Sequence, residues 1–380
     1  MIFPQKHSHT GTNIFSVMSG LAQQHNAINL SQGFPDFPID AQLAEFLADG
    51  TRNGYNQYAP MAGLPMLRAA IADDIMARYG LSVDAEQEIT VTPGATYGIY
   101  AAFTAVLQPG DEAILLEPAY DSYIPNIEMN GAKAVPVALT APDYRVDWNK
   151  VKAAITPATK AIIVNTPHNP TGAAWNHEDW HTLAEILRDT NIVILSDEVY
   201  EQLVFDGGRH YSVLQYPELR AKAFVFFSFG KVFNNTGWKM GYCIAPPGFT
   251  DAFRRIHQFL SFTVNAPAQY ALAQHLNSGT ATQVRPLMEQ KRDYFLSLLR
   301  HTPFTVYRPA AGSYFQLVGY GNISDMPDTE FAKWLTKEHG VATIPISAFY
   351  HNRKDDKIIR FCFAKKEETL ALAAERLSKL

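Results

Sequence analysis

The chain has 380 residues, which is enough for two domains or for one large domain with a smaller satellite. Its hydrophobic share of 47% and charged share of 18% are those of an ordinary soluble globular protein, and the net charge of −5 gives no electrostatic case for nucleic acid. No apolar run approaches membrane-spanning length, and residues 1–10 lack the apolar core of a signal peptide. We therefore expect neither a membrane nor a nucleic acid among its partners.

The two cysteines, Cys243 and Cys362, have no zinc or redox spacing. We expect two reduced thiols in a cytoplasmic protein, and no metal site.

Residues 1–30 read as an arm with one short helix, Ile14 to Gln24, and a loop punctuated by glycine and prolines follows. In that loop Gly33 permits close approach of the backbone to a ligand, although a simple crossover loop is the alternative. Tyr58 lies in a second loop, before a helix expected from Leu64 to Tyr79, and a lone tyrosine there is usually a packing residue.

From Glu88 onward, short apolar stretches alternate with helical patterns, which predicts a mostly parallel sheet covered by helices on both faces. Ligands bind such sheets at the carboxyl ends of the strands. The expected strands are Ile89–Val91, Ala113–Leu116, Ala134–Leu139, Ala161–Asn165, Ile192–Ser196, Ala223–Phe227 and Tyr242–Ala245, and the expected helices are Thr96–Leu107, Asp147–Ile155, Glu178–Thr190 and Pro217–Ala221.

Polar motifs follow the ends of these strands. Gly94, Ala95 and Thr96 open a helix, whose free backbone N–H groups could bind phosphate, or form a plain cap. Tyr120 could stack on a flat heterocycle or pack in the core. Asn169 stands in Asn-Pro-Thr-Gly, which could also be only a turn.

Asp197 closes the fifth expected strand, and a desolvated carboxylate there needs a cationic or donor partner. Tyr200 follows three residues later. An Asp-Glu pair also occurs in nucleoside-triphosphate binding proteins, but the chain contains no P-loop to support that interpretation.

The strand Ala223–Phe227 delivers Lys231 into a bend at Gly230, among several phenylalanines. Desolvation lowers the pKa of a lysine and frees its lone pair for attack on a carbonyl, although a surface lysine in a loop is the alternative. Ser228 and Lys239 flank this lysine with a hydroxyl and a second cation, which suits a phosphate held beside it.

After the sheet we expect a helix over Asp251–Gln258 and a long helix after Pro267, running to Arg300 with an interruption near Pro286. A smaller α/β unit follows, with strands at Phe304–Tyr307, Ser313–Leu317, Ala342–Ile344 and Ile358–Cys362 and helices at Asp328–Glu338 and Glu367–Leu380.

Arg360 lies in the last of these strands, where its guanidinium suits a planar anion or a structural salt bridge. The segment Leu260–Pro267 contains Phe262 and no arginine.

The sequence Ser-x-Gly-Lys followed by Thr-Gly-Trp-Lys-x-Gly-Tyr resembles the Schiff-base lysine region of the fold-type I pyridoxal-phosphate aminotransferases. The branch it resembles most is that of the methionine and kynurenine aminotransferases. The resemblance runs from Asn29 to Arg360 with the family's order and spacing.

This resemblance implies a large domain built on a mostly parallel seven-stranded sheet and a smaller C-terminal α/β domain. We expect an arm over residues 1–30, the cofactor-binding domain over 31–270 and the small domain over 271–380.

The resemblance also implies pyridoxal 5′-phosphate, carried on Lys231 as catalytic base and acid. Asp197 would keep the ring nitrogen protonated, and Tyr200 and Asn169 would contact the phenolic oxygen, with Tyr120 over the ring. Phosphate would be held by Gly94, Ala95, Thr96, Ser228 and Lys239, and by Tyr58 from the partner subunit of a homodimer.

Arg360 would bind the α-carboxylate of the substrate, with Asn169 and the loop residues Gly33 and Phe34 beside it. The lack of an arginine near Phe262, where the dicarboxylate-specific branch has one, implies an apolar or aromatic donor side chain between Phe34, Tyr120 and Phe262.

We expect an aminotransferase that moves the amino group of methionine, phenylalanine, tyrosine, histidine or kynurenine to a 2-oxo acid. A pyridoxal-phosphate-dependent carbon–sulfur β-lyase acting on cystathionine or cysteine S-conjugates shares nearly all these residues and remains an alternative. A non-enzymatic cofactor-sensing regulator would need an added DNA-binding module, for which residues 1–30 are too short and insufficiently basic.

Overall fold

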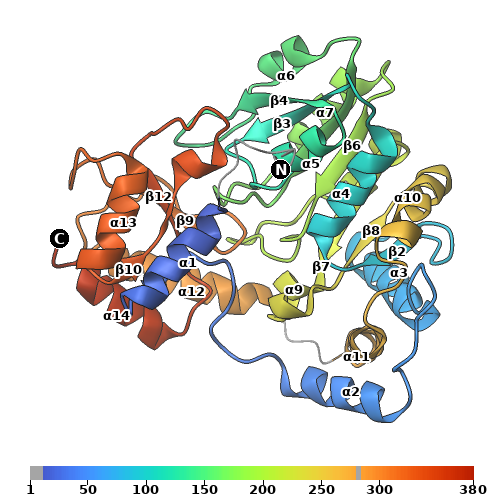
Figure 1. Ribbon diagram of the computed structural model, residues 1–380, viewed down its shortest axis with the longest axis horizontal. Coiled ribbons are helices and arrows are strands. Elements are labelled where there is room, and N and C mark those ends of the chain that lie inside the picture. Colours follow the sequence, from blue (N-terminus) through green and yellow to red (C-terminus); the bar gives the residue numbers. More distant parts are fainter. Residues whose placement is uncertain (1–11, 280–283) are drawn as a thin grey trace, which may run out of the picture.

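A seven-stranded sheet forms the centre of the larger, right-hand part of the molecule (Figure 1). The computed structural model describes residues 12–279 and 284–380. The strand order is β2-β8-β7-β6-β5-β3-β4, and β8 is antiparallel to both of its neighbours while the remaining pairs are parallel. This confirms the expected mostly parallel sheet. The strands are β2 (Ile89–Thr92), β3 (Glu112–Glu117), β4 (Lys133–Ala138), β5 (Thr159–Asn165), β6 (Val193–Asp197), β7 (Ala223–Ser228) and β8 (Gly241–Ile244).

The central strands are short buried runs rich in Val, Ile and Phe, which is the composition that a sheet covered by helices requires. Helix α4 (Ala95–Val106) lies across β6, β7 and β8 and buries six of its residues (Figure 1). The other helices of this part are α3 (Pro65–Tyr79), α5 (Tyr123–Met129), α6 (Trp148–Ala154), α7 (His177–Leu187), α8 (Pro217–Arg220), α9 (Phe229–Val232) and α10 (Pro247–Leu260).

A smaller unit is built on the antiparallel sheet β11-β12-β9, with helices packed beside it. It lies beside the large sheet, as the left part of Figure 1 shows. Its elements are α12 (Val284–Leu299), β9 (Phe315–Gly319), α13 (Asp328–Glu338), β10 (Val341–Ala342), β11 (Ile344–Pro345), β12 (Ile358–Cys362) and α14 (Glu367–Leu377).

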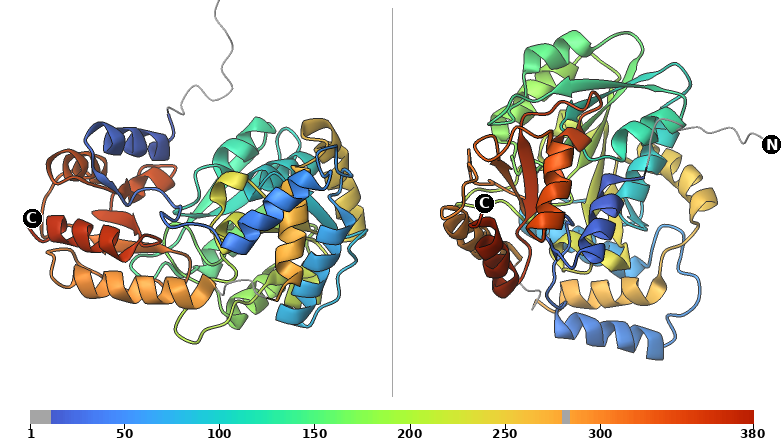
Figure 2. Two further views of the ribbon diagram at one scale, coloured as in Figure 1. Left: turned by 90° about the horizontal axis from the view of Figure 1, so that it is seen from below. Right: turned by 60° about the vertical axis from the view of Figure 1, so that its left-hand side comes forward.

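The N-terminal arm returns to this smaller unit. Strand β1 (Ile28–Asn29) pairs in parallel with β10, and helix α1 (Ile14–Gln24) packs against α13, which two views show (Figures 1 and 2). Helix α11 (Ala266–Asn277) packs instead against α2 (Ala41–Arg52) and α3. We propose three parts, namely an arm, a large unit ending after α11, and a small unit starting with α12.

Several expected elements differ in the structure. The long helix expected after Pro267 is two helices, α11 and α12; residues 280–283 of the expected span lie outside the described residues. Pro286 does not interrupt a helix, because it stands in the first turn of α12, where a missing N–H costs little. The expected strand Phe304–Tyr307 is only an isolated bridge from Thr305 to Gly319.

The expected strand Ser313–Leu317 begins two residues late, at Phe315, because Ser313 has a positive φ of 61° and cannot continue a strand. Helices α2 and α5 were not anticipated. Helix α9 replaces the simple bend expected at Gly230, so that Lys231 stands on a short helix.

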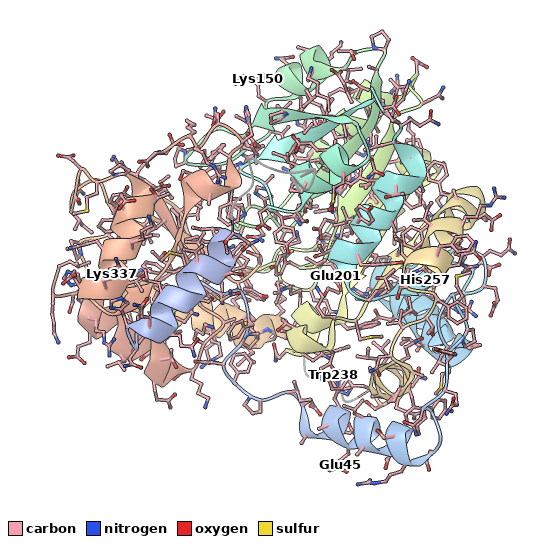
Figure 3. The ribbon with its side chains drawn as sticks, viewed as in Figure 1. Glu45, Lys150, Glu201, Trp238, His257 and Lys337 are labelled. Atoms are coloured by element: carbon pink, nitrogen blue, oxygen red, sulfur yellow. The ribbon has the colours of Figure 1, made fainter. Side chains whose placement is uncertain are left out.

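Large apolar side chains fill the interior, while most charged ones lie outside. In Figure 3 the exposed Glu45, Lys150 and Lys337 stand towards the outline of the molecule, whereas the buried Glu201 lies near its middle. Among the described residues, no helix is both long and apolar enough to span a bilayer.

Candidate active site

A cavity of about 460 Å³ opens between the carboxyl ends of β5, β6 and β7 and the small unit. Strand ends from the large sheet, the loop after β1 and the strand β12 all contribute to its walls. The predicted site residues that line it are Gly33, Gly94, Ala95, Thr96, Tyr120, Asn169, Asp197, Tyr200, Ser228, Lys231, Lys239 and Arg360.

Lys231 projects from α9, directly after β7, into this cavity. Its Nζ lies 3.4 Å from the backbone oxygen of Gly33 and 5.8 and 5.7 Å from the ring centroids of Tyr200 and Tyr314. Burial lowers the pKa of Lys231 to about 8 because the aromatic surroundings disfavour the ammonium. About a tenth of this amine is therefore neutral at pH 7, a far larger share than for a lysine in water, and the neutral form is the one that acts as a nucleophile or base.

Asp197 is the last residue of β6 and has no cationic partner in an ion pair among the described residues. The hydroxyl of Tyr123 donates to its Oδ2 at 2.5 Å, and the backbone N–H of Val199 donates to Oδ1 at 3.3 Å. Burial raises the pKa of Asp197 to about 6, while the Tyr123 hydrogen bond opposes that shift. A buried carboxylate in this state is suited to a cationic group placed in the cavity.

An anion site lies at the start of α4. Gly94 is the N-cap with a positive φ of 84°, and the N–H groups of Ala95 and Thr96 have no acceptor within the helix. A Cβ built on Gly94 would lie 3.5 Å from Nζ of Lys239, so the helix start and this cation are neighbours. With Ser228 at the end of β7, these groups form a cradle for a phosphate.

Arg360 is fully buried on β12. Its two terminal nitrogens donate to Oδ1 of Asn169 at 2.6 Å and to the backbone oxygen of Ser31 at 2.9 Å, while Nε has no partner among the residues that the structure describes. Its guanidinium lies 3.9 Å from the ring centroid of Phe315, and burial lowers its pKa to about 10. Both partners are neutral oxygens, so the guanidinium is suited to a planar anion such as a carboxylate.

Gly33 approaches the small unit closely. A Cβ at this position would lie 2.7 Å from Cζ of Phe315, so only glycine allows the loop to pass there without displacing that ring.

Three predicted residues do not line the cavity of a single chain. Phe34 is 41% exposed and lies against Nζ of Lys365 in a separate shallow hollow. Tyr58 is 82% exposed, and its ring meets Phe262 edge-on at 5.6 Å on the outer surface. Their roles in binding stay predictions.

Sequence reasoning missed Tyr123, which lies behind Asp197, and several residues that line the cavity. Tyr123 carries no motif of its own, and its role appears only when α5 places the hydroxyl on Asp197. The arm also contributes residues, and their position depends on the pairing of β1 with β10. No local sequence pattern predicts that pairing. The missed lining residues are Asn13, Phe15, Ser16, Gln32, Asn165, Val199, Gly230, Thr236, Met240 and Phe315.

His168 precedes Asn169 but does not line the cavity. Its Nδ1 lies 2.7 Å from the Thr171 hydroxyl, and burial lowers its pKa to about 4, so the ring is neutral.

Comparison with known proteins decides the family. The family model for class I and II aminotransferases matches residues 25–377. The chain belongs to this family. It is 47% identical to a methionine aminotransferase of Escherichia coli over 97% of this chain and 96% of that protein. It is 32% identical to kynurenine–oxoglutarate transaminase 1 of Mus musculus, covering 94% of this chain and 92% of that one.

A solved structure gives the same result for the fold. The protein YbdL from Escherichia coli, whose structure was described together with a methionine aminotransferase function, superposes with a TM-score of 0.97 at 46% identity over the whole of both chains. The protein is therefore an aminotransferase of fold type I that uses pyridoxal phosphate. The residues fit this cofactor, because a reactive lysine, an uncompensated buried carboxylate and an anion cradle converge on one cavity.

Proposed function

We propose that this aminotransferase takes methionine or an aromatic amino acid (phenylalanine, tyrosine, histidine or kynurenine) as donor and a 2-oxo acid as acceptor. The main support is the set of cations at the cavity. Lys231, Lys239 and Arg360 are the lysine and arginine residues among its described lining residues. Lys231 and Lys239 would hold the cofactor, and Arg360 would hold the α-carboxylate of the substrate. A second carboxylate on the substrate would therefore have no cation to pair with.

When bound, pyridoxal phosphate supplies an electron-poor ring that stabilises negative charge at the substrate Cα. Asp197 would hold the ring nitrogen, and Asn169 and Tyr200 would hold the phenolic oxygen. The cradle formed by Gly94, Ala95, Thr96, Ser228 and Lys239 would hold the phosphate.

The chain's own groups then orient the substrate and move a proton. Arg360 binds the α-carboxylate through its free Nε and through terminal nitrogens already oriented by Asn169 and Ser31. Lys231, whose pKa is lowered to about 8, would accept the proton of the substrate Cα and would donate it to the C4′ carbon of the cofactor.

Aromatic rings supply the remaining surface for the donor side chain. Phe15, Tyr120 and Phe315 line the cavity, and the rings of Phe15 and Phe315 both face the Arg360 guanidinium. Burying a side chain of methionine or phenylalanine size is worth roughly 1.5–3 kcal/mol, or about a tenfold to hundredfold preference. The relatives named as methionine and kynurenine aminotransferases have donors of this kind.

A panel of amino donors against one 2-oxo acid tests this proposal. Methionine and the aromatic donors should exceed aspartate in kcat/KM, and the purified protein should be yellow, whereas Lys231→Ala should abolish turnover. Aspartate as the best donor would contradict the proposed pocket. Pyruvate and ammonia formed from cystathionine, faster than any transamination, would favour the β-lyase instead.

We also propose a homodimer and a cytoplasmic location. Tyr58, Phe259, Leu260 and Phe262 are exposed apolar side chains close together in the sequence or in contact, a kind of surface that partners usually cover. Tyr58 would then reach the cofactor phosphate of the partner subunit. Both cysteines are buried free thiols, which suits a reducing compartment.

A further inference from the structure

Two histidines at the start of α7 point their imidazoles at each other. His177 and His181 are four residues apart on this helix, and their Nε2 atoms are 2.8 Å apart. Both side chains are exposed. The two nitrogens share one proton in this arrangement, because one must donate and the other accept.

The separation of these two atoms fits one metal geometry well. Histidine nitrogens bind first-row divalent metals at about 2.0 Å, so two ligands at a right angle lie about 2.8 Å apart. Tetrahedral ligands lie farther apart, at about 3.3 Å. Right-angled positions are those of tetragonal Cu²⁺ and Ni²⁺, which also bind nitrogen sites more strongly than most divalent metals do.

A buried tyrosine orients one of the two rings. The hydroxyl of Tyr216 lies 2.7 Å from Nδ1 of His177, and its ring meets that of His181 edge-on with centroids 5.4 Å apart. Tyr216 is itself 4% exposed. When Nδ1 of His177 donates to this hydroxyl, Nε2 keeps its lone pair facing His181, which is the tautomer that a metal requires.

We propose that His177 and His181 form a surface chelating site for a tetragonal divalent cation, Cu²⁺ or Ni²⁺, with water in its other positions. The cation takes the place of the proton between the two Nε2 atoms, and that proton moves through solvent to Nδ1 of His181, so both rings stay neutral and present their Nε2 lone pairs to the metal. Cysteine spacing alone gave no sign of this site, because both of its ligands are histidines on one helix face.

The surroundings limit what this site can do. His177-Glu178-Asp179-Trp180-His181 has the H-E-x-x-H form of zinc peptidases, but no group of three potential ligands occurs among the described residues. Asp179 is engaged in the capping box with Asn176. The site therefore binds a metal without being a peptidase centre. Glu178 and Asp179 offset the unfavourable interaction of a cation with the helix N-terminus.

Titration calorimetry on tag-free protein loaded with pyridoxal phosphate tests the proposal. CuCl₂, NiCl₂ and ZnCl₂ are titrated separately into the parent, His177→Ala, His181→Ala and His301→Ala. The chain has 12 histidines, so the readout is the difference from the parent. His301 is an exposed histidine that serves as the matched control.

We expect His177→Ala and His181→Ala each to lose one equivalent of Cu²⁺ or to bind it at least about tenfold more weakly, while His301→Ala keeps it. Affinity should fall in the order Cu²⁺, Ni²⁺, Zn²⁺. Transaminase activity should be unchanged in every variant, because neither histidine lines the central cavity. Equal Cu²⁺ binding by the parent and both variants would overturn the proposal, as would preferential binding of Zn²⁺.

Discussion

Individual residues at the cavity have pKa values well away from those that they would have in water. Lys231 and Asp197 are both desolvated, and burial moves their pKa values towards neutrality from opposite sides, to about 8 and about 6. Such shifts are typical of groups that exchange protons or pair with a bound cofactor. They also allow the two groups to be tested separately.

The pKa of Lys231 predicts how fast cofactor-free protein takes up pyridoxal phosphate. Only the neutral amine attacks an aldehyde, so the uptake rate should rise with pH and level off above about pH 8. Between about pH 8 and 10.5, Lys231 therefore binds more protons in the unfolded state than in the folded state. Its contribution to the free energy of unfolding rises with pH in that range. Stopped-flow absorbance measures the rate, and a rise continuing to pH 10 would contradict the assignment.

Replacing Asp197 by asparagine should leave the fold and cofactor binding intact but lower kcat by about 10²–10³-fold, because an amide cannot hold a full charge on the ring nitrogen. Steady-state kinetics with methionine measure the loss. Asp328→Asn is the matched control, because Asp328 is another buried aspartate but accepts from Ser347 in the small unit. Near-normal turnover in Asp197→Asn would mean that another group pairs with the ring nitrogen.

Tyr123→Phe removes one hydrogen bond and little volume. The hydroxyl favours the ionised form of Asp197, so its loss should raise the pKa of that carboxyl above its present value of about 6. The acidic limb of the kcat profile should therefore move to higher pH, and cofactor affinity should fall more at pH 6 than at pH 8. Tyr97→Phe, which loses a hydroxyl contact to His257 instead, should leave both unchanged.

At the scale of elements, the side chains at the end of β6 and in the turn after it face two different sides. Asp197 and Tyr200 face the cavity, while Glu198 and Glu201 are anchored behind it. Glu198 accepts from Ser196, from the backbone of Val213 and from His210. The turn therefore holds its two site residues in place because their neighbours are fixed on the opposite side.

Arg78 of α3 provides the second anchor. It pairs with Glu201 at 3.0 Å and also contacts Asp74 and the Tyr242 hydroxyl. The pKa of Glu201 is raised to about 7, chiefly by burial, with Arg78 opposing that shift. Arg78 thus favours the ionised form of Glu201, whereas Arg78 itself also pairs with a second carboxylate, that of Asp74.

This asymmetry makes a prediction for a double-mutant cycle. Arg78→Leu should destabilise the protein by about 1–3 kcal/mol, because it leaves a buried carboxylate without its cation, and adding Glu201→Leu should restore part of the loss. The Arg78→Leu penalty should grow as pH rises through about 7, where Glu201 ionises. Thermal unfolding measures both effects. Arg52→Leu, which breaks an exposed pair with Asp49, is the control. Strict additivity would argue against coupling between Arg78 and Glu201.

At the scale of the whole molecule, two units and the arm meet at one cavity. Helix α1 belongs by its packing to the small unit, yet Asn13 at its start hydrogen-bonds to Asp121 beside the cavity. Gln32 ties the following loop back to α1 through Ser19 and the backbone of Phe15. The arm therefore contributes Asn13, Phe15 and Ser16 to the wall of the cavity.

The exposed apolar surface near Tyr58 predicts how the protein associates. Phe259 is 86% exposed, and placing a charge there with Phe259→Asp should weaken the proposed dimer by about tenfold or more, since aromatic anchors dominate interface energies. Light scattering after gel filtration measures the mass over a range of concentrations. Leu372→Asp, on the exposed side of α14, should leave the dimer intact. A parent protein that is monomeric at every concentration would contradict the proposed dimer.

The sequence by itself determined the large sheet and most of the site. Asp197 ends an apolar run, and Lys231 follows another one closely, so both were expected at the carboxyl edge of a parallel sheet. Strand periodicity and the position of a residue within its strand are local properties, which the pattern of neighbouring side chains records directly. The same reasoning predicted a helix from Thr96, one residue after its observed start at Ala95.

Only the tertiary structure decided which distant residues meet. The pairing of β1 with β10 brings Gly33 to Lys231, and α5 brings Tyr123 to Asp197, although nothing in either segment encodes its partner. Phe34 and Phe262 were expected as pocket walls, yet both lie outside the cavity of one chain. Such contacts depend on how whole elements pack, and packing sums many weak interactions between segments that are far apart in the chain, so no local pattern specifies them.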